Sequence, residues 1–184
     1  KFPDDLNQAL EDRMPDVFCL SNYAWNLNLS LAFARYVRES SPNTVIVMGG
    51  PNICITAEGR EHFLKNQDCI DFYVKYEGEI VFCELLSKLF EYNFNARKLR
   101  EEKVKIDNLM YVENEILVEG ADQRITDLSD LPSPYTTGLL DKFFDQGLRP
   151  LVEFSRGCPY SCTFCTDFHE LRNRNVRRNL NYVE

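Results

Sequence analysis

The chain has 184 residues, of which 44% are hydrophobic and 27% are charged, with 8 glycines and 8 prolines. This composition is typical of a globular protein and excludes collagen-like, coiled-coil and low-complexity classes. The formal net charge of −8 argues against a general nucleic-acid or anionic-membrane surface. No apolar run approaches the roughly 20 residues of a membrane-spanning helix, and residues 1–5 lack a signal-peptide core, so we expect a cytoplasmic protein.

Strand and helix patterns alternate along the first 90 residues. Short apolar runs, typical of strands buried on both faces, occupy 16–20, 44–48 and, more weakly, 70–74. Helical patterns occupy 5–13, 28–40, 57–66 and 80–90. The alternation predicts an α/β fold with a doubly wound parallel sheet and right-handed crossovers. Three strands alone would leave an exposed sheet edge, so we expect an earlier βα unit to precede the chain.

The carboxyl ends of the predicted strands are the expected ligand-binding edge, as in other open α/β sheets. They carry residues 21–23, 49–51 and 76–79. Farther along, 109–112 and 116–118 predict a hairpin. A proline-rich stretch at 130–134 separates an acidic body, with a net charge of −10 up to residue 148, from a tail with a net charge of +2.

Seven cysteines fall into two groups. An odd count without an export signal disfavours a disulfide framework. Four cysteines are scattered among apolar residues, and we expect them to be small buried core residues; they are Cys19, Cys54, Cys69 and Cys83. The other three, Cys158, Cys162 and Cys165, lie close enough to hold one cofactor. Their spacing leaves two alternatives, an iron–sulfur cluster or a zinc site with His169 as the fourth ligand.

The cysteine triplet follows an apolar segment at 151–154 and has Phe164 before its last member. Cys158-x-x-x-Cys162-x-Phe164-Cys165 resembles the signature of radical S-adenosylmethionine (SAM) enzymes. The resemblance implies that the three cysteines hold a 4Fe-4S cluster whose fourth iron binds SAM, and that Phe164 lies near the adenine. Such enzymes cleave SAM reductively to a 5′-deoxyadenosyl radical.

The acidic body is similar to the Rossmann-like cobalamin-binding domains that precede some radical SAM barrels. Ser21, Tyr23, Trp25 and Asn26 match a Ser-x-Tyr-x-Trp-Asn pattern, and Gly49-Gly50 follows at the family's spacing. Residues 76–79 are similar to a Gly-Glu-Gly-Glu turn, and 128–135 to the inter-domain linker. The resemblance implies cobalamin contacts from these residues: Ser21, Tyr23, Trp25, Gly49, Gly50, Glu77 and Gly78.

Alternatives remain for these residues. A glycine pair lets the backbone approach the nucleotide tail of cobalamin, yet it also follows buried strands in many α/β turns. Trp25 covers the corrin or packs within its own loop. The family's Asp-x-His-x-x-Gly element is not found, and His62 is expected to be a solvated helix residue.

The resemblance implies three segments: a cobalamin domain at 1–125 lacking its first βα unit, a linker at 126–148, and at 149–184 the start of a partial TIM-type barrel with a helix at 176–184. The implied enzyme is a cobalamin-dependent methyltransferase acting on an unactivated carbon. A non-methylating radical reaction and a non-catalytic zinc module are the alternatives. No catalytic residue is assigned.

The partners implied are a small-molecule or natural-product-type substrate and an electron donor such as flavodoxin or ferredoxin. Nucleic acid is not expected, because the arginines of 172–178 lack interleaved aromatic residues and more often form ion pairs or a domain contact. Most of a barrel is missing, so the chain by itself is expected to be inactive.

Overall fold

The computed structural model describes residues 4–147, 149–153, 155–157, 160, 163 and 176–177. The chain divides into two compact units, residues 1–122 and residues 123–184. No helix in the described part is long and apolar enough to cross a membrane. The three segments expected from the sequence stay a prediction.

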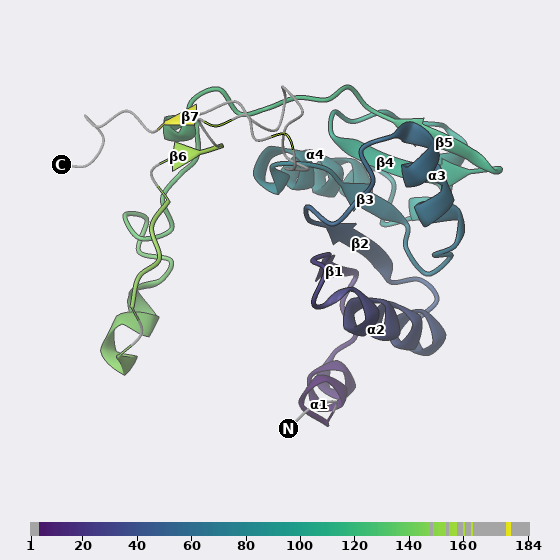
Figure 1. The fold of residues 1–184 in the computed structure, drawn as a ribbon. Coiled ribbons are helices and arrows are strands. Elements are labelled where there is room, and N and C mark those ends of the chain that lie inside the picture. The colour runs from purple at the N-terminus through teal and green to yellow at the C-terminus, as the bar shows by residue number, and fades with distance from the viewer. Residues whose placement is uncertain are drawn as a thin grey trace. The chain divides into compact units, whose positions relative to one another are not determined.

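A five-stranded mixed sheet forms the centre of the N-terminal unit (Figure 1). Its strands lie in chain order: β1 (Val17–Ser21), β2 (Val45–Gly49), β3 (Phe72–Val74), β4 (Leu109–Glu113) and β5 (Ile116–Glu119). The first three are parallel, whereas β4 is antiparallel to β3 and β5 to β4. The α/β fold is confirmed. The sheet is not parallel throughout, because the predicted hairpin adds to the free edge of β3.

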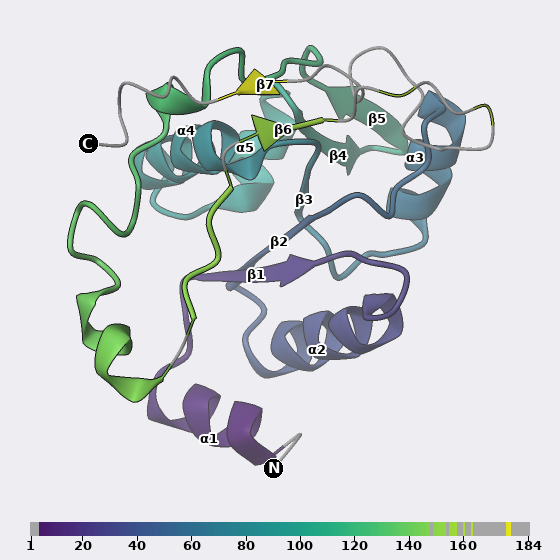
Figure 2. The same cartoon turned by 60° about the vertical axis from the view of Figure 1, so that its left-hand side comes forward.

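Helices cover both faces of this sheet, as Figure 2 shows for α2 on one side and α4 with α5 on the other. The helices are α1 (Asp4–Asp12), α2 (Leu27–Ser40), α3 (Ala57–Lys65), α4 (Gly78–Glu91) and α5 (Ala96–Glu101). Successive strand side chains point to opposite faces, so Ile46 packs in the α2–α3 core and Val45 in the α4–α5 core. β2 is therefore apolar at nearly every position.

The sequence patterns predicted α1 to α4 to within a few residues but not α5. Asn93 and Phe94, between α4 and α5, have φ values of 51° and 58°, so the chain cannot continue as a helix after α4. α5 is only six residues long, too short to display a full amphipathic period. Its Leu99 is nevertheless completely buried against the sheet.

The C-terminal unit has little regular structure among its described residues. It contains two 3₁₀ helices, η1 (Leu128–Asp130) and η2 (Asp141–Gln146). β6 (Ser155–Arg156) pairs with β7 (Val176–Arg177) in antiparallel fashion. The predicted helix at 176–184 is therefore wrong at its first two positions, where ladder bonds replace helical ones. The described residues do not form a closed barrel.

Of the four scattered cysteines, Cys69 is buried, whereas Cys19, Cys54 and Cys83 are exposed. The expectation of four core residues is wrong for these three. Cys19 lies on β1, the end strand of the described sheet, which pairs with β2 on one side. Cys83 lies on α4 roughly opposite the buried Val81 and Leu85, so it faces solvent.

Candidate functional site

The ends of β1 and β2 are joined through Asn22, the residue after β1. Its backbone N–H donates to the Gly49 carbonyl (2.6 Å), and its carbonyl accepts from Asn52 N–H (3.2 Å). Two further bonds use side chains: Asn22 Nδ2 donates to the backbone carbonyl of Asn52 (2.7 Å), and Asn52 Nδ2 donates to Asn22 Oδ1 (3.0 Å). Asn22 is 0% exposed. These four bonds tie the turn at 49–52 to the end of β1.

Different contacts disfavour a side chain at each of the two glycines in this turn. Gly50 has a φ of +129°, and a Cβ added there would lie 2.5 Å from Asn22 O. A Cβ on Gly49 would lie 3.3 Å from Val74 O, a tight contact with the neighbouring strand. Packing of the chain against itself therefore requires Gly50, with or without a ligand.

Asn26 shapes the loop between β1 and α2. Its Nδ2 donates to Ser21 Oγ (2.7 Å), and its Oδ1 accepts from Tyr23 N–H (2.7 Å). Ser30 Oγ donates to the Ser21 carbonyl (2.8 Å), which joins α2 to the same strand end. The hydroxyl of the exposed Ser21 is thus held by Asn26 at the carboxyl edge of the sheet.

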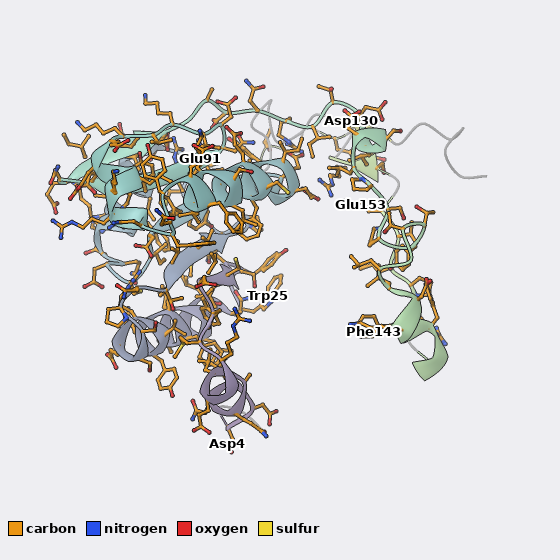
Figure 3. The ribbon with its side chains drawn as sticks, turned by 180° about the vertical axis from the view of Figure 1, so that it is seen from behind. Asp4, Trp25, Glu91, Asp130, Phe143 and Glu153 are labelled. Atoms are coloured by element: carbon orange, nitrogen blue, oxygen red, sulfur yellow. The ribbon has the colours of Figure 1, made fainter. Side chains whose placement is uncertain are left out.

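Tyr23 and Trp25 form an aromatic pair on this loop. Their rings stack with centroids 4.7 Å apart and planes 13° from parallel. Tyr23 is 37% exposed and Trp25 is 81% exposed. Figure 3 shows Trp25 projecting from the surface of the unit. Stacking on Tyr23 orients the indole, so the pair presents a flat apolar surface beside the strand ends.

Glu77 and Gly78 follow β3 at the same edge of the sheet. Glu77 is buried at the N-cap position of α4, and Gly78 is the first residue of that helix. A carboxylate at a helix N-terminus is stabilised by the helix dipole. Tyr76, just before it, has a φ of 54°, which turns the chain sharply between strand and helix.

A partly buried ion-pair cluster around the buried Lys75 supports this second turn. Lys75 Nζ contacts the Asp122 carboxylate and lies 3.9 Å from Glu119 Oε2, while Tyr76 Oη donates to Asp122 Oδ2 (3.1 Å). Arg60 Nη2 donates to Glu119 Oε2 (2.9 Å). Burial alone would raise the pKa of Asp122, but the bonds from Lys75 and Tyr76 outweigh it and lower that pKa.

The chain is similar to several known proteins, of which two relatives and one solved structure are described. No family model matches the chain. The cobalamin-dependent radical SAM methyltransferase TokK of Streptomyces tokunonensis is 33% identical over 157 residues, 82% of this chain and 22% of TokK. The anaerobic magnesium-protoporphyrin IX monomethyl ester cyclase of Synechocystis sp. is 28% identical over 133 residues, 71% of this chain and 24% of the cyclase.

This chain is a homologue of the cobalamin-dependent radical SAM methyltransferases. It spans about a quarter of the length of each of these two relatives. The solved structure of the cobalamin-dependent SAM radical enzyme OxsB, with aqua-cobalamin and SAM bound, has a TM-score of 0.64 and 21% identity. That match covers 98% of this chain and 24% of OxsB, and it supports the fold.

The cysteine motif that resembles the radical SAM signature, with Cys158, Cys162, Phe164 and Cys165, lies outside the described residues and stays a prediction. Within the part that the structure describes, no group of three or more His, Cys, Asp or Glu side chains is placed to hold a metal ion. His62 is exposed on α3, as expected, and contacts Asn66 in the next turn.

The sequence patterns do not single out three residues that shape these turns: Asn22, Lys75 and Asp122. Asn22 lies within the predicted edge at 21–23 but occupies a variable position of the Ser-x-Tyr-x-Trp-Asn pattern, so it was given no role of its own. Lys75 and Asp122 are 47 positions apart and meet because the end of β3 and the segment after β5 flank the start of β4 on its two sides. The signal available for Asn22 and Lys75 was a polar residue directly after a strand, whereas Asp122 follows β5 at a distance of three residues.

Proposed function

We propose that this chain supplies the cobalamin-binding domain and the start of the radical SAM domain of an enzyme that methylates an unactivated carbon. The observation that carries the proposal is the exposed aromatic pair beside the 49–52 turn, in a chain 33% identical to TokK. A corrin is a flat, largely apolar ring system, and stacked aromatic side chains bind such surfaces well.

In this proposal, Tyr23 and Trp25 pack against one face of the corrin ring. Ser21, Gly49 and Gly50 form the wall that receives the nucleotide tail, and Glu77 and Gly78 complete the edge. This assignment is supported by the position of these seven residues, which all lie at or just after the carboxyl ends of β1, β2 and β3. Gly50 contributes backbone rather than empty space, since Asn22 fills the place of its missing Cβ.

The iron–sulfur part of the proposal depends on the sequence motif. Three thiolates, from Cys158, Cys162 and Cys165, hold a 4Fe-4S cluster, and Phe164 packs near the adenine of SAM. When bound, the cluster and SAM would supply a radical that abstracts hydrogen, and cobalamin would supply the methyl group for transfer. The task of this chain is to bind and orient them; no side chain of it is assigned a catalytic step.

The partners follow from the same chemistry. The substrate we propose is a small molecule of natural-product type. Reductive cleavage of SAM needs one electron at a time from a low-potential donor, for which flavodoxin or ferredoxin is suited. We place the enzyme in the cytoplasm, where thiolate ligands stay reduced.

Binding of aquocobalamin to the whole purified protein tests the cobalamin site. We expect Trp25→Ala to weaken binding about tenfold, because one face of the ring loses its aromatic contact. Phe90→Ala is the matched control, since Phe90 is also an exposed aromatic residue, on α4. If the protein binds no cobalamin, or if both variants weaken binding equally, the proposed site is wrong.

Anaerobic reconstitution with iron and sulfide tests the cluster. We expect 4Fe-4S absorbance and, with dithionite and SAM, release of 5′-deoxyadenosine. Replacing Cys158, Cys162 and Cys165 together by Ala should abolish both. The control triple variant replaces the exposed Cys19, Cys54 and Cys83, and it should retain both. Zinc without iron or labile sulfide would favour a structural metal module instead.

A second candidate is a radical reaction without methyl transfer. The relative from Synechocystis, named as a cyclase, favours it. SAM labelled in its methyl group distinguishes the two candidates, because only a methyltransferase moves the label into a small-molecule product. Reaction products that carry no label, in the presence of 5′-deoxyadenosine, would support the second candidate.

A further inference from the structure

Tyr73 connects the glycine turn to the centre of the sheet. It lies on β3 and is completely buried, with its ring edge-to-face against Phe63 at 6.0 Å. Its hydroxyl donates to the Gly50 carbonyl (2.8 Å) and accepts from Asn22 Nδ2 (3.1 Å). One phenol hydroxyl thus bonds to the chain after both β1 and β2. The ring that carries this hydroxyl is fixed by its packing in the core.

Asn22 completes this support through its other contacts. Its side chain donates to Asn52 O and Tyr73 Oη and accepts from Asn52 Nδ2, and its backbone bonds to Gly49 and Asn52. The turn at 49–52 belongs to no helix, and of its residues only Gly49 is in a strand. Its shape is therefore determined by Asn22, by Tyr73 and by the contact of Gly50 with the Asn22 backbone.

We infer that Asn22 and Tyr73 are positioning residues for cobalamin binding: they hold the 49–52 turn in its binding conformation without touching the ligand. The inference rests on the proposed function. A loop that is already ordered loses less conformational entropy when a ligand binds, so tethering the turn increases affinity. Buried amide and hydroxyl groups tether strongly, because any bond they lose leaves a polar group without water.

Two Tyr→Phe variants of the whole protein make the matched test. Tyr73→Phe removes the hydroxyl that binds Gly50 O. Tyr111→Phe removes the hydroxyl of another buried tyrosine, which donates to Val104 O (2.8 Å) on the opposite face of the sheet. We expect similar losses of thermal stability. Aquocobalamin binding should weaken about tenfold for Tyr73→Phe and remain unchanged for Tyr111→Phe.

Amide hydrogen exchange without cobalamin gives a second readout. The Asn52 N–H, which donates to Asn22 O, should exchange about tenfold faster in Tyr73→Phe and at the wild-type rate in Tyr111→Phe. Asn22→Asp, which replaces the Nδ2 donor by an oxygen facing Asn52 O and Tyr73 Oη, should have the larger effect on both readouts. If Asn22→Asp fails to fold, Tyr73→Phe still decides.

Two results would overturn the inference: unchanged cobalamin affinity in Tyr73→Phe, or equal weakening in both phenylalanine variants. A wild-type protein that binds no cobalamin would overturn the proposed function instead. In that event the exchange rates still test whether Tyr73 tethers the turn. Equal exchange of the Asn52 N–H in the wild type, Tyr73→Phe and Tyr111→Phe would show that it does not.

Discussion

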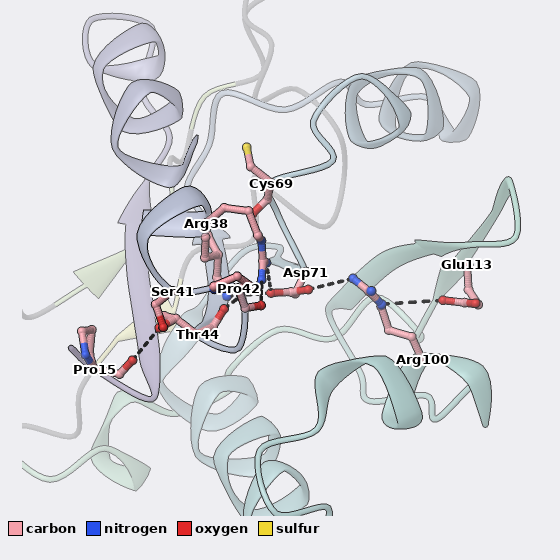
Figure 4. A network of polar contacts seen from close by, with 10 residues as sticks. Pro15, Arg38, Ser41, Pro42, Thr44, Cys69, Asp71, Arg100 and Glu113 are labelled. Carbon is pink, nitrogen blue, oxygen red and sulfur yellow. Dashed lines mark hydrogen bonds and ion pairs between the residues drawn. The ribbon is translucent and has the colours of Figure 1, made fainter. Parts of the chain in front are cut away.

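Arg38 on α2 donates from Nη2 to Oδ2 of Asp71, just before β3, with 2.5 Å between the two atoms. Figure 4 shows that the same carboxylate also accepts from Arg100 Nη1 on α5 (2.9 Å). Its Oδ2 further accepts the backbone N–H of Ile46 (2.8 Å). Arg38 in turn donates to carbonyls of the loop before β2, including Thr44 O (3.1 Å). One buried carboxylate thus joins both helical layers at the amino edge of the sheet, away from the proposed cofactor edge.

Asp71→Asn should destabilise the protein while leaving cobalamin binding unchanged. The amide keeps the size of the carboxylate but removes the charge that the partly buried Arg38 and Arg100 share, and Arg100 keeps Glu113 Oε2 at 3.6 Å from its Nε. We expect the free energy of unfolding to fall by about 2 kcal/mol in urea denaturation. Glu91→Gln, which breaks the exposed Lys88–Glu91 pair, should cost less than about 0.5 kcal/mol. Equal effects of the two variants would mean that burial of Asp71 adds nothing.

Asp122→Asn should reduce the dependence of stability on acid pH. The pKa of Asp122 is lowered below its usual 3.8 in the folded protein, so the folded state prefers the carboxylate more than the unfolded state does. Its contribution is present above the unfolded pKa and is lost as pH falls through the folded one. The variant should therefore be less stable near neutral pH and lose less stability below about pH 4.

Urea denaturation across this pH range measures the effect, and Glu84→Gln on the exposed side of α4 is the control. A variant that loses stability in acid as steeply as the wild type would show that Asp122 is not responsible.

Gly50→Ala should be far more damaging than Gly49→Ala. The new Cβ at Gly50 would lie 2.5 Å from Asn22 O at a φ of +129°, so either Asn22 or the turn must move. We expect a loss of about 3 kcal/mol or failure to fold. At Gly49 the Cβ lies 3.3 Å from Val74 O, and a small strand shift relieves it for about 1 kcal/mol. Thermal unfolding ranks the two, and the reverse order would contradict this account.

Cys69 should react with iodoacetamide more slowly than Cys54 and Cys83. It is buried, and burial raises the pKa of its thiol, so both access and the thiolate fraction are reduced. We expect at least about a tenfold difference in rate by peptide mass spectrometry. In urea the three rates should converge, which is the internal control. Equal rates in the folded protein would contradict the burial of Cys69.

The sequence by itself determined the elements whose patterns are local. The apolar run at 44–48 and the helical stripe at 28–40 predicted β2 and α2 to within one residue, because the side chains that become buried recur with the period of the element. The position of residues 21–23 and 49–51 at one edge followed from the parallel order of the strands. So did the place of the proposed cofactor site.

Only the tertiary structure decided which distant groups meet. Asn22 and Tyr73 are 51 positions apart, and their bond exists because β2 brings β1 and β3 within reach of each other. The addition of the β4–β5 hairpin to β3, and the exposure of Cys19 on the end strand, likewise depend on which strand edges are covered. Periodicity records which face of an element is buried, whereas partners across the sheet depend on strand order and register, which no local pattern encodes.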